Sequence, residues 1–504
     1  MHETDEPRSH RPDASETGRD AHSPEKAARV APWSGARGVL RQHPRASLIV
    51  AGCAIFALLG SGAVAIGAAV GNSDAARFPV AAPTPTRSTP PRPVPSAEPA
   101  AIPMRTCSVA ELATDDRLGS LQAQVRNAAT GEILFDRGGG TPNRAAGVTQ
   151  VLTAAAALKA LGRDYRVPTT VVKGAEPGTV VLVGGGDVTL SRLDSADDSI
   201  YPGSAHLDDL ADRVEKAWQA DPSTNGQPIT NLVLDSSLFA APFWQPSWDE
   251  RQERVVEGST PYITALMVDG DRADPTETDS RRSTDPVARA GEAFADELDG
   301  DITVSQGTAP AGAVQLGQVL SQPVAALAQQ AISTSDNAIM EMLARLVAIK
   351  TGAGNTFAAE NQGVVSVLHK YGIDTTGIQI ADGSGLSNDN AVPPTYLTQL
   401  FAKILARQDG LGAIYDALPI SGNTGTLAFN ERFTGDNAVA DGAVHAKTGR
   451  IDGGYTLAGI IDSEDGTPLT FAIYALGDVS DNAKRAIDTL TTGFFHCGNN
   501  LSNN

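Results

Sequence analysis

The residues with the clearest chemical potential lie near the C-terminal end, in the segment Val444-His-Ala-Lys-Thr-Gly-Arg450. The sequence predicts a strand here that ends at the glycine-rich turn Gly453-Gly454. On such a strand the Lys447 ammonium can attract a carboxylate, the Thr448 hydroxyl can bond it, and Gly449 leaves room for substrate along the strand edge. These residue types in this order predict a site for a peptide carboxylate.

A second polar cluster, Ser333-Thr-Ser-Asp-Asn-Ala338, lies upstream and opens a helix that continues with apolar residues. Ser, Asp and Asn all cap helices well, so one interpretation of Ser335-Asp336-Asn337 is a simple N-cap. The other interpretation is a group of side chains that faces the same cleft as the Lys-Thr-Gly strand. The order and spacing of the two clusters favour the second interpretation.

Further segments follow the same pattern, namely Ala381-Asp-Gly-Ser-Gly-Leu-Ser387, Thr424-Gly-Thr-Leu-Ala428 and the helical Thr153-Ala-Ala-Ala-Ala-Leu158. Together these motifs resemble the D-alanyl-D-alanine carboxypeptidase/endopeptidase family, the low-molecular-mass class C penicillin-binding proteins, and its actinobacterial members most. The resemblance covers residues 105–498. It implies a mixed α/β fold, with a β-lactamase/transpeptidase-like sheet flanked by helices.

The resemblance also implies roles for individual residues. Ser335 would shuttle protons rather than attack, and Lys447 would belong to the catalytic set. The residues implied to bind substrate are Asn337, Thr448, Gly449, Asp382 and Ser384. For the last two the alternative is a turn beside the cleft, with no direct contact to substrate.

The family's first motif, Ser-x-x-Lys at the start of the alanine-rich helix, is broken in this chain. Aligning the helix with the family places the motif on Gly147-Val148-Thr149-Gln150. Gly147 has no side chain to attack a carbonyl, and Gln150 cannot accept a proton near neutral pH. The nucleophile and the base of the family therefore appear as Gly and Gln here.

Neighbouring residues do not restore the pair. Thr149 lies two residues on, about 200° around the helix, and Lys159 lies about 18 Å along its axis. A shift of one residue does not help either, because no serine lies between Ser120 and Ser191. The chain keeps the residues that hold substrate and lacks those that make the bond.

This combination favours an impaired or noncatalytic homologue. Its expected ligands are the stem peptide of peptidoglycan, a β-lactam held without a covalent bond, and a cell-wall protein. Two alternatives stay open: an active D-alanyl-D-alanine carboxypeptidase that uses another nucleophile such as Ser335, and an envelope scaffold whose cleft is irrelevant. No cofactor is expected, and the eight histidines are isolated from one another and form no His-Glu-x-x-His motif, which argues against a zinc peptidase.

The predicted elements build one domain around this cleft. Strands are predicted at 121–137 (a hairpin), 169–183, 229–235, 444–447, 455–461 and 469–476, and helices at 148–161, 205–219, 322–350, 354–371 and 483–491. Strands at both ends with helices between them indicate a sheet built from both termini. The family inserts extra domains between its first and second motifs, and the short interval here predicts a reduced insertion at about 165–315.

The composition excludes several classes of protein. The chain has 504 residues, 41% of them hydrophobic, and so can bury more than one compact core. Its formal net charge of -20 argues against nucleic acid as a partner, because phosphate binding needs a basic surface. Three cysteines are too few for a disulfide-scaffold protein.

The N-terminal region predicts a membrane anchor. Residues 1–45 form a near-neutral polar tail, expected to be disordered and cytoplasmic, and residues 46–72 are uncharged and long enough to span a bilayer as one helix. A cleaved signal peptide is the alternative, but the preceding tail is too long for one. Basic residues before the span place the main domain outside the cell membrane. The proline-rich segment 73–104 is expected to be an extended spacer, or else a ligand for a proline-recognising domain.

Cys107 opens the folded region and Cys497 almost closes it, while Cys53 lies in the predicted span. Outside the cell the first two meet oxidising conditions, which predicts a disulfide between them. The alternative is two unpaired buried thiols.

Overall fold

The computed structural model describes residues 104–429 and 431–504. The predicted tail (1–45), the predicted anchor (46–72) and all but the last residue of the predicted spacer lie outside the described residues. Within the described part, no helix has the length and apolar character needed to span a bilayer.

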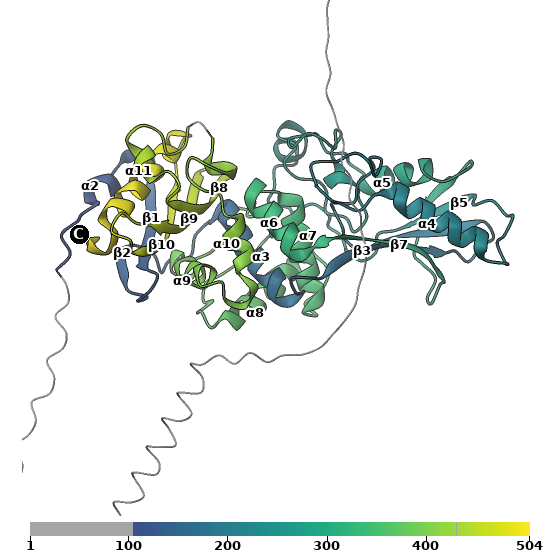
Figure 1. The fold of residues 1–504 in the computed structure, drawn as a ribbon, viewed down its shortest axis with the longest axis horizontal. Coiled ribbons are helices and arrows are strands. Elements are labelled where there is room, and N and C mark those ends of the chain that lie inside the picture. Colours follow the sequence, from purple (N-terminus) through teal and green to yellow (C-terminus); the bar gives the residue numbers. More distant parts are fainter. Residues whose placement is uncertain (1–103, 430) are drawn as a thin grey trace, which may run out of the picture. The chain divides into compact units, whose positions relative to one another are not determined.

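A five-stranded antiparallel sheet is built from the two ends of the described chain, as the sequence predicts (Figure 1). Its spatial order is β2-β1-β10-β9-β8. The strands are β1 (Ser120–Asn127), β2 (Ile133–Arg137), β8 (Val444–Ile451), β9 (Gly454–Asp462) and β10 (Pro468–Leu476). The strand that carries Lys-Thr-Gly, β8, is at the edge of the sheet. The segment around Ile420 bonds its first residues, up to Ala446, and the outer edge beyond them faces the turn before α3 (Thr149–Ala160).

Both faces of this sheet are covered by helices. Alternate residues of β10 point to opposite faces: Phe471 and Ile473 pack in one cluster with Phe494 of α11 (Asn482–Cys497), and Tyr474 packs in the other with helices from the middle of the chain. Burial on both faces explains why β9 and β10 are apolar almost throughout.

The middle helices form one buried cluster against the sheet. They are α3 (Thr149–Ala160), α6 (Val324–Thr334), α7 (Asn337–Lys350), α8 (Phe357–Leu368), α9 (Pro394–Leu405) and α10 (Gly412–Ala417). The short α2 (Ala110–Ala113) packs in the other cluster, with α11. The helical stretch predicted at 322–350 is broken in two, because Ser335 has a left-handed backbone that ends α6. The sequence analysis missed α9 and α10.

A second five-stranded sheet occupies the interval in which a reduced insertion was expected. Its order is β6-β5-β4-β3-β7, in which β4, β5 and β6 run parallel. The strands are β3 (Arg166–Lys173), β4 (Thr179–Gly184), β5 (Asn231–Asp235), β6 (Thr303–Gln306) and β7 (Gln315–Pro323), and the helices α4 (Leu207–Ala220) and α5 (Pro286–Asp296) complete its separate core. We call residues 166–323 the insertion.

Cys107 and Cys497 form a disulfide across a sequence separation of 390 residues, which confirms the predicted pairing. The bond links the segment before α2 to the end of α11.

Replacing both cysteines by serine is expected to lower the free energy of unfolding by about 2–4 kcal/mol, because the cross-link restricts a very long loop of the unfolded chain. Thermal unfolding with and without reductant measures the effect. Reductant should lower the melting temperature of the wild type to that of the variant and leave the variant unchanged. Equal melting temperatures of oxidised wild type and variant would contradict this expectation.

Candidate functional site

Gly147 lies in the 3-10 turn Ala146–Val148, which leads into α3 and packs against β8. A Cβ atom built on Gly147 would be 3.5 Å from the Nζ atom of Lys447. The same atom would be 2.9 Å from the carbonyl oxygen of Thr448. Position 147 therefore faces the Lys-Thr-Gly strand, where a nucleophile would have to be.

Gln150 is fully buried in the first turn of α3. Its Nε2 atom donates a hydrogen bond of 3.1 Å to Oδ1 of Asn337, and its Oε1 atom has no hydrogen-bond partner among the described residues. Gln150 thus ties α3 to the second motif as a donor. An amide has no proton-accepting nitrogen, so it cannot act as a base there.

The ammonium group of Lys447 lies under the floor of the cleft. It is fully buried and donates hydrogen bonds of 2.9 Å to the Ser335 hydroxyl and to the Thr448 carbonyl oxygen. Burial lowers the pKa of Lys447 to about 7, since none of the described carboxylates pairs with it. Lys447 is not among the residues that line the cavity, so its charge would reach a bound carboxylate across Ser335 and Thr448.

Ser335 is held in an unusual backbone conformation. Its φ of 63° and ψ of 41° place a non-glycine residue in the left-handed region, at the end of α6. Asp336 then caps α7 by accepting a hydrogen bond of 2.9 Å from the Ile339 amide. Both earlier interpretations of this cluster therefore apply, because Asp336 is the N-cap while Ser335 and Asn337 face the cleft.

On β8, the Thr448 hydroxyl lies 2.8 Å from the hydroxyl of Thr426, which belongs to the Thr-Gly-Thr segment. Only one of the two hydroxyl hydrogens is needed for that contact, so the other can be donated to a ligand. Gly449 must be glycine, since a Cβ there would be 2.6 Å from the Gly147 nitrogen. The strand and the turn before α3 are thus packed as closely as backbone allows.

These elements enclose a cavity of about 240 Å³. Its lining includes the sequence-predicted Gly147, Ser335, Asn337, Ser384, Thr448 and Gly449. It also includes residues that the sequence analysis missed as site residues, namely Glu257, Ser259, Thr426, Phe429, Arg450 and Lys484. A signal existed for Thr426, which lies in a recognised motif. None existed for Glu257 and Ser259, which lie on a loop of the insertion.

Asp382, which the sequence offered as a substrate contact, is not among the residues that line the cavity. Its carboxylate is fully buried and accepts hydrogen bonds of 2.7 Å from the Trp248 indole, the Gly385 amide and the Asn390 side chain. These bonds fix the loop that presents Ser384 to the cleft. Asp382 has the alternative role considered for it, that of organising a turn.

A buried glutamate supports the same loop from below. Glu341 of α7 accepts hydrogen bonds from the amides of Gly383 and Ser384, at 3.1 and 2.7 Å. Burial and the nearby Asp382 carboxylate raise the pKa of Glu341 to about 8. Among the described residues, no group of three His, Cys, Asp or Glu side chains is placed to hold a metal ion.

The arrangement can hold a peptide with a terminal carboxylate, and it offers no side chain at position 147 to attack one. Sequence comparison relates the chain to a known family. A model of the D-Ala-D-Ala carboxypeptidase 3 (S13) family matches residues 106–279 and 266–494.

Individual relatives agree with this match. The carboxypeptidase DacB of Mycolicibacterium smegmatis is 34% identical over 462 residues, which are 90% of this chain and 98% of that protein. A D-alanyl-D-alanine carboxypeptidase of an Actinomadura species is 28% identical over 416 residues, 69% of this chain and 76% of the relative. The fold is similar to that of penicillin binding protein 4 from Haemophilus influenzae, with a TM-score of 0.61 at 21% identity over 76% of this chain and 97% of the other.

Proposed function

This chain belongs to the D-Ala-D-Ala carboxypeptidase 3 (S13) family, and on that premise we propose that its cleft binds the D-alanine-terminated peptides of peptidoglycan without forming an acyl-enzyme through the first motif. The observation that carries the proposal is the placement of Gly147 and Gln150. Gly147 faces the Lys447 ammonium, and Gln150 bonds Asn337. Losing a nucleophile typically removes several orders of magnitude in rate, whereas the binding groups remain.

The binding groups suit a peptide carboxylate. The hydroxyls of Thr426 and Thr448 can donate to it, and the side chains of Arg450 and Lys484 lie at the same cavity. The buried Lys447 adds positive charge from below when it is protonated. A β-lactam, which carries a carboxylate of similar placement, would bind in the same way and without a covalent bond.

Replacing Thr448 by valine is expected to weaken the binding of an acetylated peptide ending in D-Ala-D-Ala by roughly 10- to 100-fold, because a hydrogen bond to a charged group contributes roughly 1.5–3 kcal/mol. Isothermal titration calorimetry measures the affinity, and Thr448→Ser should retain most of it. Thr351→Val serves as a matched control, since the Thr351 hydroxyl donates only to carbonyls of its own helix.

The outcomes separate the three functions. A wild type that binds the peptide tightly and leaves it uncleaved supports the proposal. A wild type that binds no peptide supports the envelope scaffold, whose cleft plays no part. Release of D-alanine by the wild type supports an active carboxypeptidase.

One observation favours that active alternative. The Ser335 hydroxyl oxygen accepts a hydrogen bond of 2.9 Å from Lys447, whose pKa of about 7 leaves a neutral amine available near neutral pH. In this reading the Ser335 oxygen attacks the carbonyl while its proton passes to the Lys447 amine, which then gives that proton to the D-alanine nitrogen as the peptide bond breaks. Ser335→Ala would then abolish D-alanine release, whereas it leaves a pure binding function in place.

We further propose that the domain acts outside the cell membrane, held by the single span predicted at 46–72, with the N-terminus in the cytoplasm. The uncharged span and the basic residues before it support this placement. The Cys107–Cys497 disulfide also supports it, because such bonds persist in oxidising compartments. We also keep a protein of the cell wall in the proposal, as a second candidate ligand of the cleft.

A further inference from the structure

The insertion reaches the second motif through the carboxylate of Asp336. One oxygen of Asp336 caps α7. The other accepts a hydrogen bond of 3.0 Å from the Tyr201 hydroxyl and one of 3.1 Å from the Arg272 guanidinium. All three side chains are buried. The residue between Ser335 and Asn337 is therefore fixed from the insertion as well as from its own helix.

Arg272 is itself held from several sides. Its guanidinium donates to the Tyr201 hydroxyl at 2.6 Å, to the Asp269 carbonyl at 3.2 Å and to the Thr278 carbonyl at 3.1 Å. The planar fork of arginine loses little freedom when several of its donors are satisfied at once. Arg272 thus presents a rigid donor to Asp336 rather than a mobile charge.

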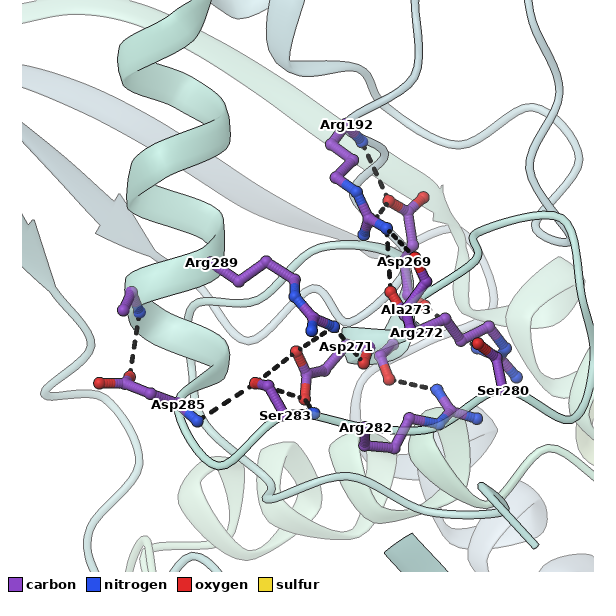
Figure 2. A network of polar contacts seen from close by, with 12 residues as sticks. Arg192, Asp269, Asp271, Arg272, Ala273, Ser280, Arg282, Ser283, Asp285 and Arg289 are labelled. Atoms are coloured by element: carbon purple, nitrogen blue, oxygen red, sulfur yellow. Dashed lines mark hydrogen bonds and ion pairs between the residues drawn. The ribbon is translucent and has the colours of Figure 1, made fainter. Parts of the chain in front are cut away.

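The three residues directly before Arg272, Asp269–Asp271, form a strained turn. Asp269, Gly270 and Asp271 have φ values of 49°, 59° and 58°, a run of three residues in the left-handed region. Figure 2 shows the arginines that hold it: Arg192 pairs with Asp269 at 3.1 Å and Arg289 pairs with Asp271 at 2.8 Å. Strain of this kind persists only where the surroundings over-determine it, and it concentrates at functional sites.

A second arginine reaches the other end of the motif. Arg282 is buried and donates to the carbonyl oxygens of Gly270 and Gly258, the latter at 2.8 Å. Ser259, the next residue, lines the cavity, and its carbonyl oxygen accepts a hydrogen bond of 3.3 Å from the Asn337 side chain. The insertion therefore contacts the motif directly through Arg272, and indirectly through Arg282, which holds the Gly258–Ser259 backbone that bonds Asn337.

We propose that Tyr201, Arg272 and Arg282 are positioning residues of the cleft, through which the insertion holds Ser335 and Asn337 in the geometry that faces Lys447 and Gln150. Ser335 needs such support, because a left-handed backbone is unfavourable for a residue with a Cβ. The expected effect on peptide affinity rests on the proposed function, whereas the positioning of Ser335 and Asn337 does not depend on it.

The test compares Tyr201→Phe with Tyr371→Phe. Each variant removes one buried hydroxyl and keeps the ring, but the Tyr371 hydroxyl donates to the Ala155 carbonyl in the helical core, away from the motif. Hydrogen–deuterium exchange of residues 333–341 reports the α6–α7 junction directly. We expect exchange there to rise about threefold to tenfold in Tyr201→Phe, the equivalent of one lost hydrogen bond, and to be unchanged in Tyr371→Phe.

Arg272→Lys supplies a second variant, which keeps the charge and loses the fork. Arg272→Lys should raise exchange at the junction in the same way. Tyr201→Phe and Arg272→Lys should each bind the D-Ala-D-Ala peptide about threefold to tenfold more weakly than Tyr371→Phe, by the same hydrogen-bond estimate. Unchanged junction exchange in both variants would overturn the proposal, as would an equal rise in Tyr371→Phe. A wild type that binds no peptide would refute the proposed function, and the exchange measurement would still decide the positioning.

Discussion

A fluorescent penicillin is expected to leave the wild type unlabelled and to acylate the double variant Gly147→Ser, Gln150→Lys. A serine at position 147 places its Cβ 3.5 Å from the Lys447 amine. A lysine at position 150 brings an amine to the Asn337 side chain that Gln150 now bonds at 3.1 Å. Nucleophile and base act as a unit, so restoring both should raise the labelling rate by a factor on the order of 10³ or more.

The geometry limits how complete this rescue can be. The new Cβ would also be 2.9 Å from the Thr448 carbonyl oxygen and 3.3 Å from the Gly449 Cα, so β8 must move by a few tenths of an ångström. Gly147→Ala with Gln150→Lys imposes the same crowding without a hydroxyl and is the matched control. Labelling of the wild type, mapped by mass spectrometry to any hydroxyl, would contradict the expectation, and so would a folded double variant that stays unlabelled.

Replacing Lys447 by methionine is expected to weaken peptide binding at pH 6 by a factor on the order of 10–100. An ammonium about 6 Å from a carboxylate contributes roughly 2–3 kcal/mol at an effective dielectric constant of about 20. Lys447 is charged below its pKa of about 7 and neutral above it. The affinity of the wild type should therefore fall as the pH rises through 7, and that of the variant should change little.

Calorimetry at pH 6 and pH 9 measures this difference, with Lys159→Met as the control, since Lys159 pairs with Asp409 on the surface. Weaker binding by the Lys447→Met variant at pH 6 cannot be explained by a loss of folded protein. Because the folded state lowers the pKa of Lys447 from 10.5, its burial costs stability that is recovered as the pH rises from 7 to 10.5. Removing the charge should leave the variant at least as stable at pH 6. A wild-type affinity that is equal at both pH values would contradict the prediction.

Sequence reasoning located the parts of the site whose signals are local. Lys447, Thr448 and Gly449 follow one another on a strand, and the capping residues around Asp336 mark the start of a helix. The pairing of Cys107 with Cys497 could also be predicted, since the domain offers no other cysteine.

The features of the site that sequence reasoning did not find depend on contacts between distant segments of the chain. Asp382 matches a family motif, but only the fold places the Trp248 indole and the Asn390 amide on its carboxylate and so turns it away from the cleft. Nothing near Arg272 or Ser259 in the sequence points to a cleft more than 60 residues along the chain. Their roles follow from how the insertion packs against α7.

The disulfide has a mechanical consequence. Any pull that arrives along the chain from before residue 104 enters the domain at Cys107, and the covalent link passes it at once to the end of α11. The load is then shared between two ends of the structure, and β1 is not peeled alone from its neighbour β10. If the domain is anchored and binds peptidoglycan as proposed above, this link would spread tension between its two ends and away from the cleft.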